Sequence, residues 1–100
     1  MRKIEPTSAF KRDFKREAKG ALRAVLDTEL KQVITDLANG VPLASKHRDH
    51  ALTGGWKDYR DCHVRPHLVL IYRLMGSDDT GDSPACLVLA RLGSHSELDL

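Results

Sequence analysis

The sequence predicts one α+β domain in which two N-terminal helices pack on a small twisted antiparallel sheet. Apolar residues follow helical spacing as far as Gly40, whereas short runs rich in aliphatic and β-branched residues begin after Trp56. Arg65 and Pro66 are almost all that separates the first two of these runs, so the two strands must form an antiparallel hairpin. Residues 2–5 are too short to classify by pattern, and a short first strand there fits the same architecture.

The first helix is predicted to begin after Pro6, with Thr7 or Ser8 as N-cap. Phe10, Phe14 and Ala18 recur every four residues and form an apolar stripe that belongs in the core. The rest of the helix carries cations that can meet a phosphate backbone or simply face solvent; they are Lys11, Arg12, Lys15, Arg16 and Lys19.

The second helix is predicted from an apolar stripe with helical spacing, and Asn39-Gly40 is a typical stop signal. The stripe consists of Leu22, Val25, Leu26, Leu30, Val33, Ile34 and Leu37. Residues 43–55 read as a loop with one helical turn at most. Three strands follow, over "YRDCHV", "LVLIYRL" and "ACLVLARL", with the polar turn "GSDDTGDSP" before the last.

Length and composition limit the class of protein. With 100 residues the chain is expected to be one domain, residues 1–100. The longest apolar run, Leu68 to Tyr72, is far too short to span a membrane, and no apolar signal-peptide core is present, so we expect a cytoplasmic protein without a membrane partner. Cys62 and Cys86 lack CxxC partners and are expected to be reduced strand residues.

Histidine is unusually concentrated, because four of the five lie between residues 47 and 67. They are His47, His50, His63 and His67, and the fifth is His95. His63 shares a strand face with Tyr59 and Asp61, which is either solvated or lines a cleft. The spacing His47-x2-His50 with His63-x3-His67 resembles a zinc site, although sites with only histidine ligands are unusual.

Metal-free acid–base catalysis is the alternative use for these imidazoles, because their pKa lies near working pH. Cleavage of RNA needs a base for the ribose 2′-OH, an acid for the leaving 5′-oxygen and a cation for the phosphorane. Arg91 is a charged residue within an otherwise apolar strand. It is either an edge residue whose guanidinium lies in solvent or the cation that stabilises the phosphorane. This chemistry requires no cofactor.

Residues from Pro42 onward resemble the YafQ branch of the RelE/ParE superfamily of bacterial toxins. The motif is the combination His50-x-Leu52-x-Gly54, Trp56, Tyr59-Arg60-Asp61, His63-Val64, Pro66 and Leu70-Ile71-Tyr72, followed by "LVLARLGSHSEL". The helical half agrees with the family in pattern only, so the likeness covers the whole chain at the level of element order.

The resemblance implies a ribosome-dependent endoribonuclease that cleaves mRNA in the A site and is inhibited by a cognate antitoxin, through which the pair binds operator DNA. His50, His63 and His95 match family positions implicated in catalysis, His95 as proton donor, and Arg91 matches the phosphate-stabilising arginine. The basic first helix and Arg60 become expected RNA contacts. A non-enzymatic ParE-like gyrase inhibitor and a histidine-bound zinc protein remain the alternatives.

Three positions depart from the family pattern. His67 stands where an aspartate is usual, Leu68 where tryptophan is frequent, and Asp99 where an aromatic residue often precedes the end. His67 can still exchange a proton and is expected to assist, but it cannot hold a neighbouring imidazole in its charged form as a carboxylate does. The loss of aromatic residues removes a platform on which an mRNA base could stack.

Overall fold

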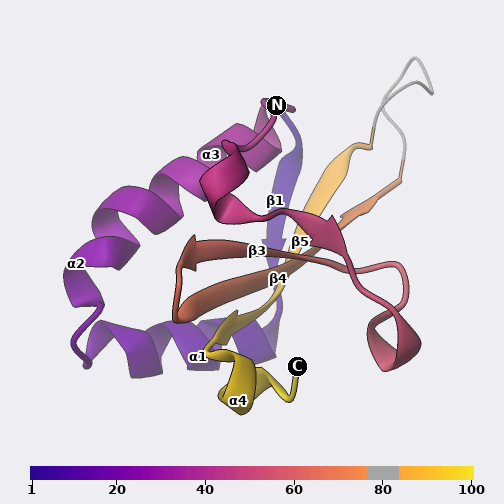
Figure 1. Ribbon diagram of the computed structural model, residues 1–100. Helices are drawn as coiled ribbons and strands as arrows, with labels where there is room; N and C mark the ends of the chain where they lie inside the picture. The colour runs from indigo at the N-terminus through magenta and orange to yellow at the C-terminus, as the bar shows by residue number, and fades with distance from the viewer. Residues whose placement is uncertain (77–83) are drawn as a thin grey trace.

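The computed structural model describes residues 1–76 and 84–100 and confirms the α+β class, with helices packed on a five-stranded sheet (Figure 1). Its strands are β1 (Lys3–Pro6), β2 (His50–Ala51), β3 (Arg60–Arg65), β4 (Leu68–Met75) and β5 (Cys86–Gly93). Its helical segments are α1 (Ser8–Ala18), α2 (Arg23–Val25), η1 (Leu26–Leu30), α3 (Lys31–Ala38), η2 (Ser45–His47), η3 (Gly54–Trp56) and α4 (His95–Leu98). Within the described ranges, no helix has the length and apolar character that crossing a membrane requires.

The N-terminal helices form where apolar periodicity predicts them. Thr7 caps α1, and its hydroxyl accepts a hydrogen bond from the Phe10 amide at 3.0 Å. The predicted second helix is one continuous run made of α2, the π-helical turn η1 and α3, and it ends at Asn39 before Gly40, whose φ is +71°. Phe14 corrects the predicted core: it is 36% exposed, whereas Phe10 is buried in the main core.

The sheet has the order β1-β5-β4-β3-β2. The predicted hairpin is confirmed, since β3 and β4 pair antiparallel across the turn at Pro66 and His67. One edge corrects the prediction of an antiparallel sheet: β1 runs parallel to β5, with Lys3 opposite Cys86, so the sheet is mixed. The whole intervening chain connects these strands, which is ample for a parallel crossover. Most of the predicted polar turn, residues 77–83, lies outside the described residues.

The two faces of the sheet differ in character. The face toward α1, α2 and α3 holds the main core, to which β3 contributes Cys62 and Val64. Cys62 and Cys86 are both free, as predicted. The opposite face carries a small apolar cluster of Val69, Ile71, Ala90 and Leu98, covered in part by α4 and by the segment between β2 and β3. Polar groups therefore meet low-dielectric surroundings on this second face.

Helix α1 also completes the edge of β5 beyond the end of β1. The Thr7 amide donates to the Leu89 carbonyl and the Thr7 hydroxyl to the Ala90 carbonyl, at 3.0 and 2.9 Å. One turn later, the Leu92 amide donates to Asp13 at 3.0 Å, and Arg16 donates to the Leu92 carbonyl at 2.9 Å. Side chains of α1 thus replace the strand partner that β5 lacks here.

Candidate active site

The register of the sheet aligns several chemically active residues across four strands. His50 on β2 pairs with Asp61 on β3, Asp61 pairs with Ile71 on β4, and Ile71 pairs with Arg91 on β5. Directly opposed residues of antiparallel strands point to the same face. One row of the sheet therefore carries an imidazole, a carboxylate and a guanidinium on the face that opposes the main core.

His63 and His95 meet beside this row. His63 lies two residues after Asp61 on β3, and its row continues through Val69 to Gly93, the last residue of β5. Ser94 then caps α4, and His95 is the first residue of that helix. The ring centroids of His63 and His95 are 4.9 Å apart. Segments distant in sequence thus place two imidazoles in contact.

Asp61 lies among the three imidazoles and is only 2% exposed. Its Oδ1 atom is 3.1 Å from Nδ1 of His50, yet it accepts no hydrogen bond from the described part of the chain. Burial raises the pKa of Asp61, and the attraction of His50, His63 and His95 offsets this effect only in part. We refer to His50, Asp61, His63 and His95 as the histidine cluster.

Backbone carbonyls fix the tautomers of two histidines. Nδ1 of His50 lies 2.7 Å from the Arg48 carbonyl, which the left-handed conformation of Arg48, φ 46°, directs toward it. Nδ1 of His47 lies 2.7 Å from the carbonyl of His63. Because a carbonyl only accepts, each Nδ1 carries the proton, and Nε2 of a neutral His50 keeps its lone pair. The same contact explains why Oδ1 of Asp61 has no donor.

His63 is suited to accept a proton. Burial lowers the pKa of His63, and the positive charges of His95, Arg48 and His50 lower it further, against the opposing effect of Asp61. The ring is therefore neutral at neutral pH, which is the form that a general base requires.

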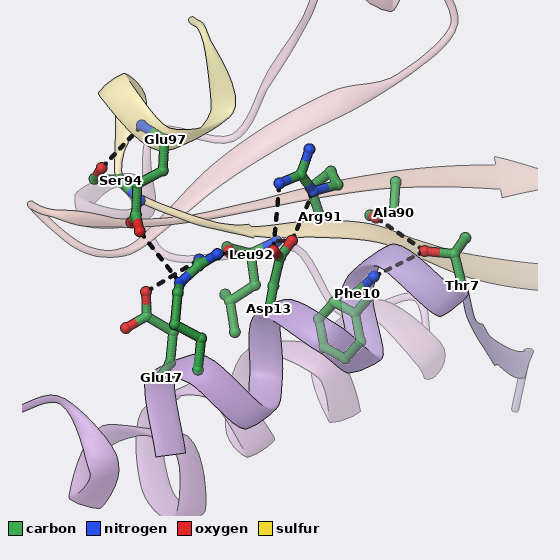
Figure 2. Close-up of polar contacts among 10 residues, drawn as sticks. Thr7, Phe10, Asp13, Glu17, Ala90, Arg91, Leu92, Ser94 and Glu97 are labelled. Carbon is green, nitrogen blue, oxygen red and sulfur yellow. Dashed lines mark hydrogen bonds and ion pairs between the residues drawn. The ribbon is translucent and has the colours of Figure 1, made fainter. Parts of the chain in front are cut away.

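Arg91 is bound to an aspartate of α1 rather than to a histidine. Its Nε and Nη2 atoms donate to the two carboxylate oxygens of Asp13, at 2.7 and 3.3 Å (Figure 2). Arg16 donates to the same carboxylate at 3.0 Å and reaches Glu97 on α4 at 3.2 Å. The side chain of Arg91 is 31% exposed, so its outer edge can still meet a ligand. We refer to Asp13, Arg16, Arg91 and Glu97 as the Asp13 network.

The carboxylate of Asp13 is fully engaged. Burial alone would raise its pKa, but hydrogen bonds from Arg91 and from the Leu92 amide outweigh burial and hold the pKa of Asp13 below its ordinary value. The hydrogen bond to Asp13 likewise raises the pKa of Arg91. The guanidinium is thus held charged and in one orientation on the same face as the histidine cluster.

The other predicted site residues fall into two groups. The exposed cations on α1 and at its C-cap are Lys11, Arg12, Lys15 and Lys19. The second group has three members, two of which are ion-paired and partly exposed. Arg16 is engaged in the Asp13 network, Arg60 pairs with Asp49 at 3.2 Å, and His67 is exposed at the hairpin turn.

Two important residues were absent from the predicted site, Asp13 and Asp61. A weak signal existed for each. Asp13 lies one turn after Phe10, on the buried side of a basic helix, and Asp61 alternates with His63 on one strand face. The described residues contain no group of three or more His, Cys, Asp or Glu side chains arranged to hold a metal ion.

Comparison with known proteins shows close relatives over nearly the whole chain. Residues 2–100 match the family model of YafQ, described as a bacterial toxin of a type II toxin–antitoxin system. The mRNA interferase toxin YafQ of Escherichia coli is 36% identical over 99 residues, covering 98% of this chain and 96% of that protein.

Solved structures agree with this similarity. A copper-bound mutant toxin from Helicobacter pylori superposes with a TM-score of 0.81 at 37% identity, covering 98% of this chain and 99% of that one. The toxin in the E. coli DinJ–YafQ complex superposes with a TM-score of 0.75 at 35% identity, covering 98% of both chains. The architecture, including the short β1, is therefore that of these toxins.

Proposed function

Because the chain belongs to the YafQ family of type II toxin–antitoxin toxins, we propose that it is an endoribonuclease that cleaves mRNA in the ribosomal A site without a metal ion. The observation that supports this activity best is the histidine cluster, in which three imidazoles surround a buried carboxylate. An acid and a base close together are what cleavage by the ribose 2′-OH requires.

The proposed cleavage reaction needs only an acid, a base and a cation that this chain supplies. The 2′-oxygen forms a bond to the adjacent phosphorus, the bond from phosphorus to the 5′-oxygen breaks, and a 2′,3′-cyclic phosphate and a 5′-hydroxyl result. His63 or His50 takes the 2′-proton, and His95 gives a proton to the leaving 5′-oxygen. Arg91 stabilises the charge of the phosphorane, for which Asp13 holds its guanidinium in place.

Asp61 acts as a positioning residue in this scheme. No contact with RNA is assigned to it. Its negative charge raises the pKa of His63, against the larger lowering effect of burial. That His67 assists in proton transfer remains a prediction.

Partners follow from the same family. The related YafQ of E. coli is known in a complex with DinJ, and we propose that a cognate antitoxin inhibits this chain in the same manner and links the pair to operator DNA. The exposed cations of α1 contact ribosomal RNA, because neutralised phosphates release counter-ions whatever the sequence.

The replacement His95→Gln tests this function. We expect cleavage of a translated message to fall roughly 10²- to 10⁴-fold, the usual contribution of a general acid, with no change in the unfolding curve. Lys31→Gln, at an exposed position of α3 without an assigned role, is the control and should cleave normally. Normal cleavage by His95→Gln would show that His95 is not the general acid. Loss of activity after the toxin alone is treated with EDTA and separated from it, restored by zinc, would favour the metal-site alternative.

A further inference from the structure

We propose that the cavity beside His63 binds the nucleotide of the mRNA strand that neighbours the scissile phosphate, an inference that rests on the function proposed above. The cavity has a volume of about 410 Å³ and lies between η2 and the end of β3. Its lining residues are Lys46, His47, Arg48, His63, Val64, Arg65 and Pro66.

The walls of the cavity match the two halves of a nucleotide. Lys46, Arg48 and Arg65 provide positive charge for a phosphate, and the exposed Pro66 provides apolar surface for a base. The volume falls within the range of roughly 300–1,000 Å³ that small-molecule sites occupy. A single nucleotide is thus a suitable occupant in both size and charge.

His63 connects the cavity with the reaction. Its ring contacts His95 in the histidine cluster, and the same residue lines the cavity, which neither His50 nor His95 does. The hydrogen bond between His47 and the His63 carbonyl joins the η2 wall to β3 at this point. An RNA strand with its scissile phosphate between His63 and His95 therefore places an adjoining nucleotide in the cavity.

One acidic residue opposes binding at this site. Nε of Arg65 lies 2.7 Å from Oε2 of Glu29, in a pair whose side chains are 50% and 37% exposed. A nucleotide phosphate must compete with this carboxylate for Arg65. Removal of Glu29 is therefore expected to strengthen binding, an outcome that a merely structural pair would not produce.

The test is an NMR titration of the full-length toxin with a diribonucleoside phosphate whose first sugar lacks the 2′-hydroxyl and cannot be cleaved. We expect shifts at His47, His63 and Val64, and an affinity about tenfold weaker in Lys46→Ala/Arg65→Gln, because two exposed cations are lost. The control Lys31→Ala/Arg23→Gln removes the same charge from exposed positions of α3 and α2 and should bind normally. Glu29→Gln should bind about threefold tighter.

Two outcomes would overturn the proposal: shifts that avoid these residues, or equal binding by both double variants. Inorganic phosphate serves as a second ligand, and equal affinity for phosphate and the dinucleotide would reduce the cavity to an unspecific anion site. The titration does not depend on catalysis. A toxin that binds the dinucleotide there but fails to cleave mRNA would contradict the proposed function and leave the binding site intact.

Discussion

Two buried aspartates, Asp13 on α1 and Asp61 on β3, have opposite surroundings. Asp13 is 3% exposed and Asp61 is 2% exposed, so the two carboxylates have lost water to the same degree. Asp13 accepts hydrogen bonds from two guanidiniums and an amide, and its pKa is lowered. Asp61 leaves Oδ1 without a donor from the described residues, and its pKa is raised.

We relate this difference in hydrogen-bond partners to two different roles, one structural and one catalytic. A buried charge with its full set of partners stabilises the fold and orients those partners, which for Asp13 include Arg91. A buried charge without enough donors costs stability and persists where it serves chemistry. We infer that Asp13 holds the Arg91 guanidinium in place, whereas Asp61 acts on the pKa of the neighbouring His63.

Asp13→Asn should give the larger loss of stability. An amide cannot satisfy Arg91, Arg16 and the Leu92 amide together, so we expect the free energy of unfolding to fall by about 3 kcal/mol. Urea denaturation measures this change, with the exposed Asp27→Asn as control. A loss equal to that of the control would mean that the Asp13 network contributes little.

Asp61→Asn should show the reverse pattern. We expect kcat for mRNA cleavage to fall about 10- to 100-fold, as for other residues that orient a catalytic group. The free energy of unfolding should stay the same or rise by about 1 kcal/mol, because an uncompensated charge is removed. Full activity in Asp61→Asn, or a stability loss like that of Asp13→Asn, would show that the two carboxylates do not have different roles.

The pH dependence of stability sharpens the comparison. Since the folded pKa of Asp13 is lowered, its contribution is present above its ordinary value of 3.8 and is lost as the pH falls through the folded pKa. The folded pKa of Asp61 is raised. The stability linked to its protonated form is therefore present below pH 3.8 and is lost as the pH rises through the folded pKa.

Urea denaturation of both variants from pH 3 to pH 7 measures these contributions. The deficit of Asp13→Asn should shrink toward the acid end, whereas the advantage of Asp61→Asn over the wild-type chain should appear only as the pH rises. Curves that change in parallel for both variants would show that the two carboxylates titrate alike.

Local pattern predicted the longer elements of the fold, whereas the two-residue β2 and the four-residue α4 were not predicted. Apolar spacing indicated both helices, Thr7 was a correct N-cap, and the short link at Pro66 specified the antiparallel hairpin. The parallel pairing of β1 with β5 was missed, because an edge strand of four exposed residues has no apolar pattern of its own. Phe14 was misplaced because helical spacing cannot show how wide the buried stripe is.

The site was harder to predict than the fold. Residue types and family resemblance singled out His50, His63 and His95, and the structure brings them together. The partners of Arg91 and Arg16 were not predictable, because Asp13 meets Arg91 only after α1 has docked on the edge of β5. A pattern shows which face of an element is polar, but it does not show which distant element covers that face.

Analysis of the RNA ends tests the central claim, metal-free acid–base cleavage by the histidine cluster, most directly. Purified toxin is treated with EDTA, separated from the chelator by gel filtration and then incubated with ribosomes translating a message, and the new termini are identified. We predict 2′,3′-cyclic phosphate and 5′-hydroxyl ends, and no cleavage where the sugar before the scissile phosphate lacks its 2′-hydroxyl. Products with 5′-phosphate ends, formed only when zinc is returned to the EDTA-treated toxin, would contradict the account.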